Sequence, residues 1–370
     1  MTTWDTYPID YRAKEVQSIL AAVQAGDCVS LVGLSGSGKS NLLGFIANRL
    51  AQQQPPLPGL PTFVLVDCNR AVEFTLPAFF RLLLVAMQVE VSPLSTDEFS
   101  RLEGTIRKQL ASGTRLCLLL DRFDAFTHPA LDEKIRLALA SNLRALRDAY
   151  KYDLTLVIAT RHPPDPHTEL AELLFANTLW LGPLCEKDAR WNIARYASHR
   201  NLAWDEETTQ AILRLSWGYP SILRAACEAM ALSSSRDESS LTQHPAVCKR
   251  VEEFWADGPT QEELRLSRLA HHPLLDTART PGRFDTSQLT AKEHLMWQYM
   301  LRRAGQVCEK DDLIRAVWPE DRIYEQGIRD DSLAQLVRRL REKIEPDPSN
   351  PKYILTLPGR GYRLCLEPKG

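Results

Sequence analysis

The spacing of apolar residues changes twice along the chain. In residues 1–182, short runs of continuous apolar residues alternate with amphipathic stretches. The runs are rich in β-branched residues, which is typical of strands buried on both faces. They are Cys28–Gly33, Thr62–Asp67, Leu116–Asp121 and Leu154–Thr160. Because strands and helices alternate, we expect an α/β domain: a parallel sheet with helices on both faces.

Residues 183–262 carry their apolar residues at helical spacing. We therefore expect an all-helical lid subdomain, with a polar loop at Ser233–Thr242. The predicted helices are Cys185–Ser198, Asp205–Ser216, Pro220–Ser233 and Ala246–Trp255. Residues 273–287 are rich in Pro, Arg and Thr without a clear period, so we interpret residues 263–285 as a linker.

Residues 286–370 predict three helices and a β-hairpin. Thr290 and Glu293 have the spacing of a capping box at the start of the first helix. The second helix contains Leu313–Trp318 and the third is Ser332–Ile344. The stretch YILTLPGRGYRL alternates apolar and polar residues around Pro-Gly-Arg-Gly, which predicts a hairpin with a tight tip.

The composition is that of a soluble globular protein, with 44% apolar and 25% charged residues among 370. No apolar run reaches the ~20 residues of a membrane-spanning helix, and no export signal is visible at the N-terminus. The eight cysteines form no Cys-x-x-Cys pair. We therefore expect buried free thiols in a reducing cytoplasm, and neither a disulfide framework nor a zinc site. The formal charge of −2 argues against a surface covered in basic residues.

A phosphate-binding motif lies between the first predicted strand and helix. Gly33, Gly38, Lys39 and Ser40 satisfy G-x-x-x-x-G-K-[ST]. The glycines allow backbone N–H groups to turn inward as an anion-binding nest, to which the next helix adds its dipole. Lys39 can reach the β- and γ-phosphates, and the Ser40 hydroxyl can ligate Mg²⁺. The expected nucleotide contacts are Gly33, Ser35, Gly36, Ser37, Gly38, Lys39, Ser40 and Asn41. The alternative is a glycine-rich turn with an incidental Lys-Ser pair.

Asp121 ends the third predicted strand. A carboxylate in that place, together with Ser40, is expected to hold Mg²⁺ beside the phosphates. ATP and Mg²⁺ are therefore the predicted cofactors. The alternative is that Asp121 is a helix cap or a surface acid.

Three stretches carry a resemblance to a known group: LLLDRFDAF, SNLRALRDAYKYDLTLVIATR and SWGYPSILRAACEAM. Over residues 11–230 the chain resembles a branch of the AAA+/STAND P-loop ATPases. The resemblance implies a γ-phosphate sensor at Thr160, with Arg161 beside it. It also implies a lid proline close to the nucleotide base at Pro220 and an arginine close to the adenine at Arg12.

The sequence departs from that group at Arg122, which stands where a glutamate usually polarises the attacking water. An arginine cannot accept a proton at working pH. Asp124 is the nearest substitute, so Asp121, Asp124 and Thr160 form the expected catalytic set. We expect slow or partner-dependent hydrolysis. The alternative is that Asp124 or another acid, such as Glu73, supports ordinary hydrolysis.

Arg144 and Arg147 are candidates for arginine fingers that act on a neighbouring subunit. Both lie on one predicted helix, and a solvated helix face is the favoured interpretation.

The C-terminal residues resemble the OmpR/PhoB-type winged-helix domain. The matching residues are Leu289, Thr290, Glu293, Gly305, Leu313, Val317, Trp318, Arg338–Lys343, Gly359, Gly361, Tyr362 and Arg363. The resemblance implies that the third helix enters the DNA major groove and that the hairpin, the wing, touches the minor groove. The implied DNA contacts are Ser332, Gln335, Arg338, Arg339, Arg341 and Arg360.

Three positions depart from the winged-helix pattern: Asp331, Leu336 and Pro358. An arginine, a polar base-reading residue and a wing arginine are usual there, and a carboxylate facing phosphates is repelled. The alternative is a winged helix that contacts protein through a solvated basic face.

Together these features predict an ATP-binding switch that couples its nucleotide state to double-stranded DNA, as a regulator with slow hydrolysis. The expected partners are DNA, a protein effector or sensor chain, and further copies in a nucleotide-dependent homo-oligomer. Two alternatives stay open. One is a signalling or defence scaffold of the STAND type, whose winged helix binds a protein. The other is a DNA-remodelling or loader ATPase.

Overall fold

In the computed structural model of the protein, the chain forms two compact units, Met1–Ala270 and His271–Gly370. The structure describes residues 3–52, 59–90, 97–128, 130–164, 168–174, 177–232, 238–275, 289–301, 303, 305–318, 330–345 and 347–365. Within these ranges, no helix is long and apolar enough to span a membrane.

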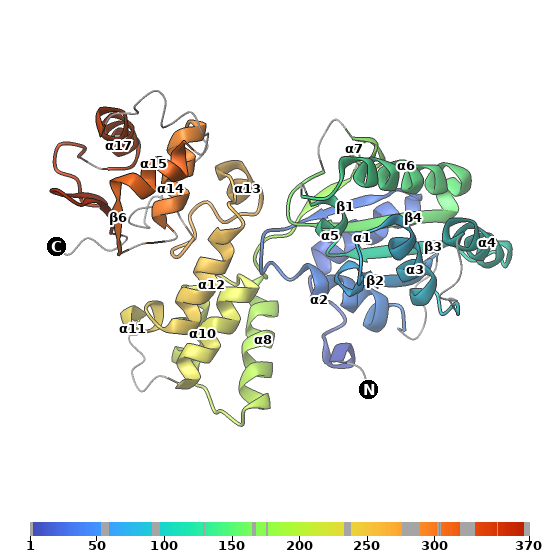
Figure 1. Ribbon diagram of the computed structural model, residues 1–370. Coiled ribbons are helices and arrows are strands. Elements are labelled where there is room, and N and C mark those ends of the chain that lie inside the picture. Colours follow the sequence, from blue (N-terminus) through green and yellow to red (C-terminus); the bar gives the residue numbers. More distant parts are fainter. Residues whose placement is uncertain are drawn as a thin grey trace. The chain divides into compact units, whose positions relative to one another are not determined.

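The first unit contains a parallel sheet of five strands in the order β2-β3-β4-β1-β5 (Figure 1). The strands are β1 (Val29–Val32), β2 (Thr62–Asp67), β3 (Leu116–Asp121), β4 (Leu154–Thr160) and β5 (Thr178–Trp180). The first four confirm the predicted α/β fold. β5 was not predicted, because three residues are too few to show a periodicity. Asp67 and Asp121 are in register at the carboxyl ends of β2 and β3.

Helices cover both faces of this sheet. Four of them, α3 (Leu76–Ala86), α4 (Glu98–Ala111), α6 (Glu133–Tyr150) and α7 (Glu169–Leu174), pack on alternate residues of β2, β3 and β4. The other strand residues point to the opposite face. There α1 (Ala13–Ala25), α2 (Lys39–Gly44) and its π-helical continuation η2 (Phe45–Leu50) contact the strands. The short elements are η1 (Thr3–Thr6), η3 (Cys68–Arg70), α5 (Asp124–Thr127) and η4 (Lys151–Asp153).

The helical part of the first unit follows β5, and in Figure 1 α8 and α10 lie side by side. Its helices are α8 (Glu186–His199), α9 (Glu206–Ser216), α10 (Pro220–Leu232), α11 (Glu238–Thr242), α12 (Pro245–Ala256) and α13 (Gln261–Leu266). The loop predicted at Ser233–Thr242 is wrong for residues 238–242, which form α11. α13 extends to Leu266 and thus overlaps the first residues of the predicted linker, 263–285. A capping box between Thr260 and Glu263 fixes its first turn.

The second unit contains a three-stranded antiparallel sheet in the order β6-β8-β7. Its elements are α14 (Ala291–Leu301), β6 (Val307–Glu309), α15 (Lys310–Val317), α17 (Asp330–Ile344), β7 (Ile354–Leu357) and β8 (Gly361–Leu364). The three helices and the hairpin confirm the predicted winged helix. β6 was missed, since its three residues pair only with the distant β8. A shortened extra sheet was considered within 274–284, of which residues 276–284 lie outside the described ranges.

Gly361 shows why the hairpin needs a glycine at the start of β8. Its φ is 145°, and a Cβ built there would lie 2.1 Å from the carbonyl oxygen of Cys308 in the neighbouring segment. Gly359, in the hairpin turn, has φ 74° but no atom within 4 Å of such a Cβ.

We therefore expect Gly361→Ala to destabilise the winged helix by about 2 kcal/mol or more, because backbone must move. Gly359→Ala is the matched control, and its left-handed φ alone costs about 1 kcal/mol. Chemical denaturation of the whole protein, followed in the transition of the second unit, measures both. Equal losses for the two variants would contradict the close approach at Gly361.

Candidate nucleotide site

The phosphate loop connects β1 to α2 at the carboxyl edge of the sheet. Gly36 and Gly38 have φ of 81° and 91°, and α2 begins at Lys39. These left-handed positions strongly favour glycine. The residues of the predicted motif are therefore together in one loop that leads into a helix N-terminus, which is a favourable geometry for an anion.

The helical part of the unit donates hydrogen bonds to two carbonyl oxygens of the phosphate loop. The Tyr219 hydroxyl donates to Ser35 O at 2.7 Å, and the Ser221 N–H donates to Gly36 O at 3.1 Å. Pro220, between them, packs against Gly38, where an added Cβ would lie 3.5 Å from its Cγ. The N-terminus of α10 thus lies on the phosphate loop. The place close to the nucleotide base that the resemblance implied for Pro220 stays a prediction.

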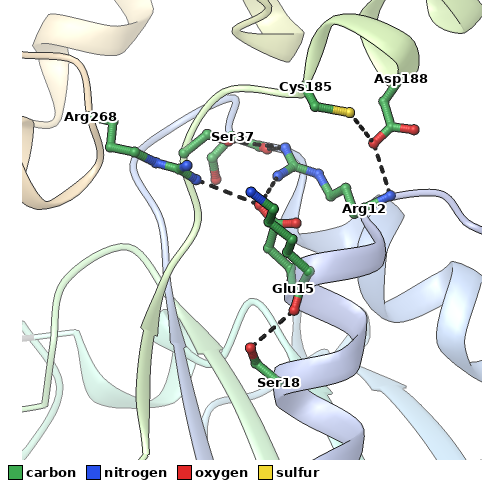
Figure 2. Close-up of polar contacts among 9 residues, drawn as sticks. Arg12, Glu15, Ser18, Ser37, Cys185, Asp188 and Arg268 are labelled. Carbon is green, nitrogen blue, oxygen red and sulfur yellow. Dashed lines mark hydrogen bonds and ion pairs between the residues drawn. The ribbon is translucent and has the colours of Figure 1, made fainter.

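After Ser35 and Gly36, the next carbonyl oxygen of the loop, that of Ser37, accepts a hydrogen bond from Arg12. Arg12 is only 2% exposed, and its Nη2 donates to Ser37 O at 2.9 Å and to Gly182 O at 3.1 Å (Figure 2). The Arg12 N–H donates to Asp188 Oδ2 at 2.9 Å. Its guanidinium therefore braces the loop and the start of the helical part. The resemblance implied a place close to the adenine for Arg12, and that place stays a prediction.

Lys39 donates to the Gly33 carbonyl oxygen. Burial lowers the pKa of Lys39 to about 8, against the opposing pull of the Asp124 and Asp121 carboxylates. A lysine with this pKa is still mostly charged at neutral pH, and loses its charge within the mildly alkaline range.

Asp121 is 5% exposed, and burial raises its pKa, opposed by the Ser40 hydroxyl and the Arg122 guanidinium. Its Oδ1 is buried without a hydrogen-bond partner among the described residues. An orphaned carboxylate oxygen beside a hydroxyl is a donor set that suits Mg²⁺. No cluster of three His, Cys, Asp or Glu that could hold a metal occurs in the described part of the chain. A metal here would thus depend on the nucleotide for further ligands.

Asp124 and Thr160 meet at the carboxyl ends of β3 and β4. Both oxygens of Asp124 accept from the Arg161 N–H, at 2.9 and 3.1 Å. Thr160 is 5% exposed, and its Oγ1 has no hydrogen-bond partner among the described residues. The hydroxyl is thus free to donate to a ligand, which suits the predicted sensor.

Arg122 adopts a left-handed backbone with φ of 54°. Its guanidinium lies 3.7 Å from Asp67 Oδ2 and 4.0 Å from Asp121 Oδ2 and is half exposed. The side chain therefore presents a cation to two carboxylates at the strand ends. Glu73, the other acid considered, is exposed and does not line the cavity beside the loop.

A cavity of about 880 Å³ opens beside the phosphate loop. Besides the loop residues and Asn41, it is lined by Asp124, Arg161 and residues of the helical part. Sequence reasoning missed Arg224 and Arg250, which bring two cations to this cavity from α10 and α12. Arg224 lies four residues after Pro220, and residues at this spacing share one face of a helix. The predicted position of Pro220 at the site could therefore have indicated Arg224.

The proposed arginine fingers are engaged within the subunit. Arg147 Nη2 donates to Gly26 O at 2.7 Å, at the amino edge of the sheet, and Arg144 pairs with Glu172 and Asp148. These contacts favour the alternative of an ordinary helix face.

In the second unit, α17 exposes Ser332, Gln335, Arg338 and Arg339 on one side. Leu336 is buried in the core, so its departure from the family pattern removes no exposed contact. Arg360 is exposed in the hairpin turn. The side chain of Asp331 lies outside the described residues.

Arg341 differs from the other arginines of α17. Its Nε and Nη2 donate to Ile354 O at 3.0 and 2.5 Å, and Nη2 also donates to Thr356 Oγ1 at 2.9 Å. Burial lowers the pKa of its guanidinium. These bonds tie α17 to β7, so Arg341 braces the domain. The DNA contact predicted for it stays a prediction.

Two family models match the chain. Residues 285–364 match "Transcriptional regulatory protein, C terminal", and residues 11–233, more than half of the chain, match "Novel STAND NTPase 1". The chain belongs to the novel STAND NTPase 1 family. This STAND NTPase thus carries a winged helix of the transcriptional-regulator type, and both resemblances inferred from its sequence are confirmed.

Solved structures similar to this STAND NTPase include the ORC2 protein of Aeropyrum pernix in ADPNP–ADP complexes. It is 13% identical over 97% of this chain and 90% of that one, with a TM-score of 0.49. A Walker-type ATPase of Pyrococcus abyssi is 15% identical over 98% and 97%, with a TM-score of 0.46. The ORC1 protein of Aeropyrum pernix in complex with DNA is 15% identical over 91% and 84%, with a TM-score of 0.46. At these identities and scores, the assignment depends on the family models.

Lys39 gives a prediction about pH. A bound triphosphate favours the charged lysine, so binding above pH 8 requires uptake of a proton. We expect the affinity for ATP to fall about tenfold between pH 7 and pH 9, as measured by calorimetric titration at constant ionic strength. Lys39→Arg keeps its charge throughout this range, so its profile should be flat. A wild-type profile as flat as that of Lys39→Arg would refute the assignment.

Proposed function

We propose that this STAND NTPase is an ATP-binding switch that couples its nucleotide state to DNA binding through the winged helix, as a regulator with slow hydrolysis. The observation that carries the proposal is the contact of α10 with the phosphate loop. Because Ser35 and Gly36 are held by Tyr219 and Ser221, a phosphate that reshapes the loop also acts on the helical part.

The residues around the cavity have the chemistry that a triphosphate requires. The loop N–H groups and Lys39 would hold the β- and γ-phosphates, and Thr160 would donate to the γ-phosphate. Ser40 and Asp121 would hold Mg²⁺, which neutralises phosphate charge when bound. Arg224 and Arg250 line the same cavity from the helical part, so they would respond to the number of phosphates.

Slow hydrolysis is supported by the surroundings of the two acids. Arg122, in the usual place of the general base, is a cation directed at Asp67 and Asp121. Asp124 accepts from the Arg161 N–H with both oxygens. A carboxylate engaged in this way is a poorer acceptor for the proton of an attacking water.

DNA binding is supported by the exposed cations of α17 and the hairpin turn. Arg338, Arg339 and Arg360 are exposed, and one ion pair, between Arg338 and Glu342 at 3.1 Å, must open for Arg338 to meet a phosphate. An exposed pair of this kind opens at little cost.

The decisive experiment measures the mobility of labelled duplex DNA with nucleotide-free, ADP-bound and ATP-analogue-bound protein. We expect the ATP-analogue state to differ from the other two by at least tenfold in apparent affinity. Lys39→Ala should abolish that difference, because it removes the phosphate contact. The mass of the protein in each state, from light scattering, tests the nucleotide-dependent homo-oligomer.

Arg338→Ala separates DNA binding from a winged helix that binds protein. Loss of one phosphate contact should lower the salt dependence of DNA affinity by about one unit in the log–log slope. Arg315→Ala, an exposed arginine on α15 that pairs with Asp312, is the matched control and should leave the slope unchanged. No salt-dependent affinity for DNA in any nucleotide state would favour the protein-binding scaffold.

Replacement of Arg122 tests whether this residue makes ATP hydrolysis slow. Arg122→Glu supplies an acceptor in the place of the usual general base, so we expect ATP turnover to rise by about tenfold or more. Arg122→Ala removes the cation without adding a base and should change turnover much less. Steady-state phosphate release measures both. Rapid hydrolysis by the wild-type protein alone would instead favour a remodelling or loader ATPase.

A further inference from the structure

The last part of the first unit, residues 257–268, is fastened to the nucleotide domain by ion pairs. We call these residues the exit segment, because the chain passes from them into the second unit at His271. Three polar contacts hold the segment among the described residues: the ion pairs Arg161–Asp257 and Glu15–Arg268, and the contact of His162 with Glu263. On the nucleotide-domain side, each partner lies within three residues of a group already placed at the site, Thr160 or Arg12.

Arg161 connects the exit segment to the phosphates most directly. Its N–H donates to Asp124, its side chain lines the cavity beside the phosphate loop, and its guanidinium is paired with Asp257. Asp257 is only 16% exposed on its side chain. Its second oxygen, Oδ2, is buried without a hydrogen-bond partner among the described residues. Arg161 therefore supplies the ion pair that the Asp257 carboxylate makes in this structure.

The second attachment stabilises the start of α13. His162 Nδ1 lies 2.6 Å from Glu263 Oε1. The other oxygen of Glu263 accepts from the Thr260 N–H at 2.8 Å, which closes the capping box. A displacement of His162 would therefore disturb the first turn of the helix.

The third attachment leads back to the phosphate loop. Glu15 Oε1 lies 3.4 Å from Arg12 Nη1 and 3.6 Å from Arg268 Nη2, and Figure 2 shows Glu15 between these two arginines. Arg12 in turn holds Ser37 O. Gly182 lies directly against this end of the segment, since a Cβ there would be 2.8 Å from Ser267 O.

We propose that Arg161 exchanges partners with the nucleotide: it pairs with Asp257 when no γ-phosphate is present, and moves to the γ-phosphate when ATP binds. A guanidinium forms strong bidentate contacts with phosphate. Asp257, only 16% exposed on its side chain, then loses the cation with which it is paired, which destabilises the docked exit segment. This inference depends on the proposed function, because it supplies the route from the triphosphate to the chain that enters the winged helix.

The exchange implies a reciprocal linkage. If ATP must take Arg161 from Asp257, the ion pair opposes ATP binding, and its removal must favour ATP by the same factor. ADP has no γ-phosphate and therefore does not compete for Arg161. The two nucleotides thus distinguish an exchange from a merely structural ion pair.

The test uses the full-length protein and measures the affinities for a non-hydrolysable ATP analogue and for ADP by calorimetry. We expect Asp257→Asn to raise the affinity for the ATP analogue about tenfold and to leave that for ADP unchanged. Glu262→Gln is the matched control: Glu262 is an exposed acid of α13 that pairs with Arg265, and its loss should change neither affinity. Equal changes for both nucleotides in Asp257→Asn would overturn the exchange and leave only a structural role.

Hydrogen exchange of the segment provides a second readout that does not depend on affinity. In the wild-type protein, amides of residues 257–268 should exchange faster with the ATP analogue bound than with ADP. In Arg161→Ala they should exchange fast in both states. If the hydrogen-exchange rates of residues 257–268 were the same with both nucleotides, while DNA binding still depended on the nucleotide, this inference alone would be overturned. Failure to bind either nucleotide would overturn the proposed function.

Discussion

The arrangement of the site depends on how three consecutive carbonyl oxygens of the phosphate loop are satisfied. A loop that turns its N–H groups toward an anion must turn carbonyl groups outward, and these need donors. Tyr219 satisfies Ser35 and the Ser221 N–H satisfies Gly36, while Arg12 satisfies Ser37. Two of these donors belong to the helical part of the unit. A change in the shape of the phosphate loop must therefore change the position of the helical part, and the reverse also holds.

The exit segment extends this connection toward the end of the first unit. Its charged side chains contact Arg161, His162 and Glu15 of the nucleotide domain, while Leu264 supplies buried apolar surface. An ion pair with a half-exposed partner such as Arg161 contributes little net stability, but loss of that partner leaves the carboxylate of Asp257, which is mostly shielded from water, unpaired at a cost. Buried apolar contacts keep the segment folded as partners change. An element that keeps its fold through apolar contacts and is attached through charged side chains is well suited to respond to a bound anion.

The sequence predicted the features that follow from local pattern. The four long strands and the phosphate loop were found because each is continuous in the chain, and Asp121 followed from the end of its strand. Elements that depend on distant partners escaped: β5 and β6 have three residues each, and pair with strands far away in sequence. The polar composition before residue 242 concealed α11. Arg224 and Arg250 became visible as site residues only when two helices were brought to one cavity.

The bracing of Arg341 has a consequence for the interpretation of mutational surveys of the basic helix. Its guanidinium joins α17 to β7 through hydrogen bonds to Ile354 and Thr356. Loss of these bonds would change the position of the hairpin relative to α17 and would weaken all DNA contacts of the domain together. A scan that scores only retention on DNA would rank Arg341 with true phosphate contacts such as those proposed for Arg338. The two classes are separated by melting behaviour, since a surface cation leaves the fold intact and a brace does not.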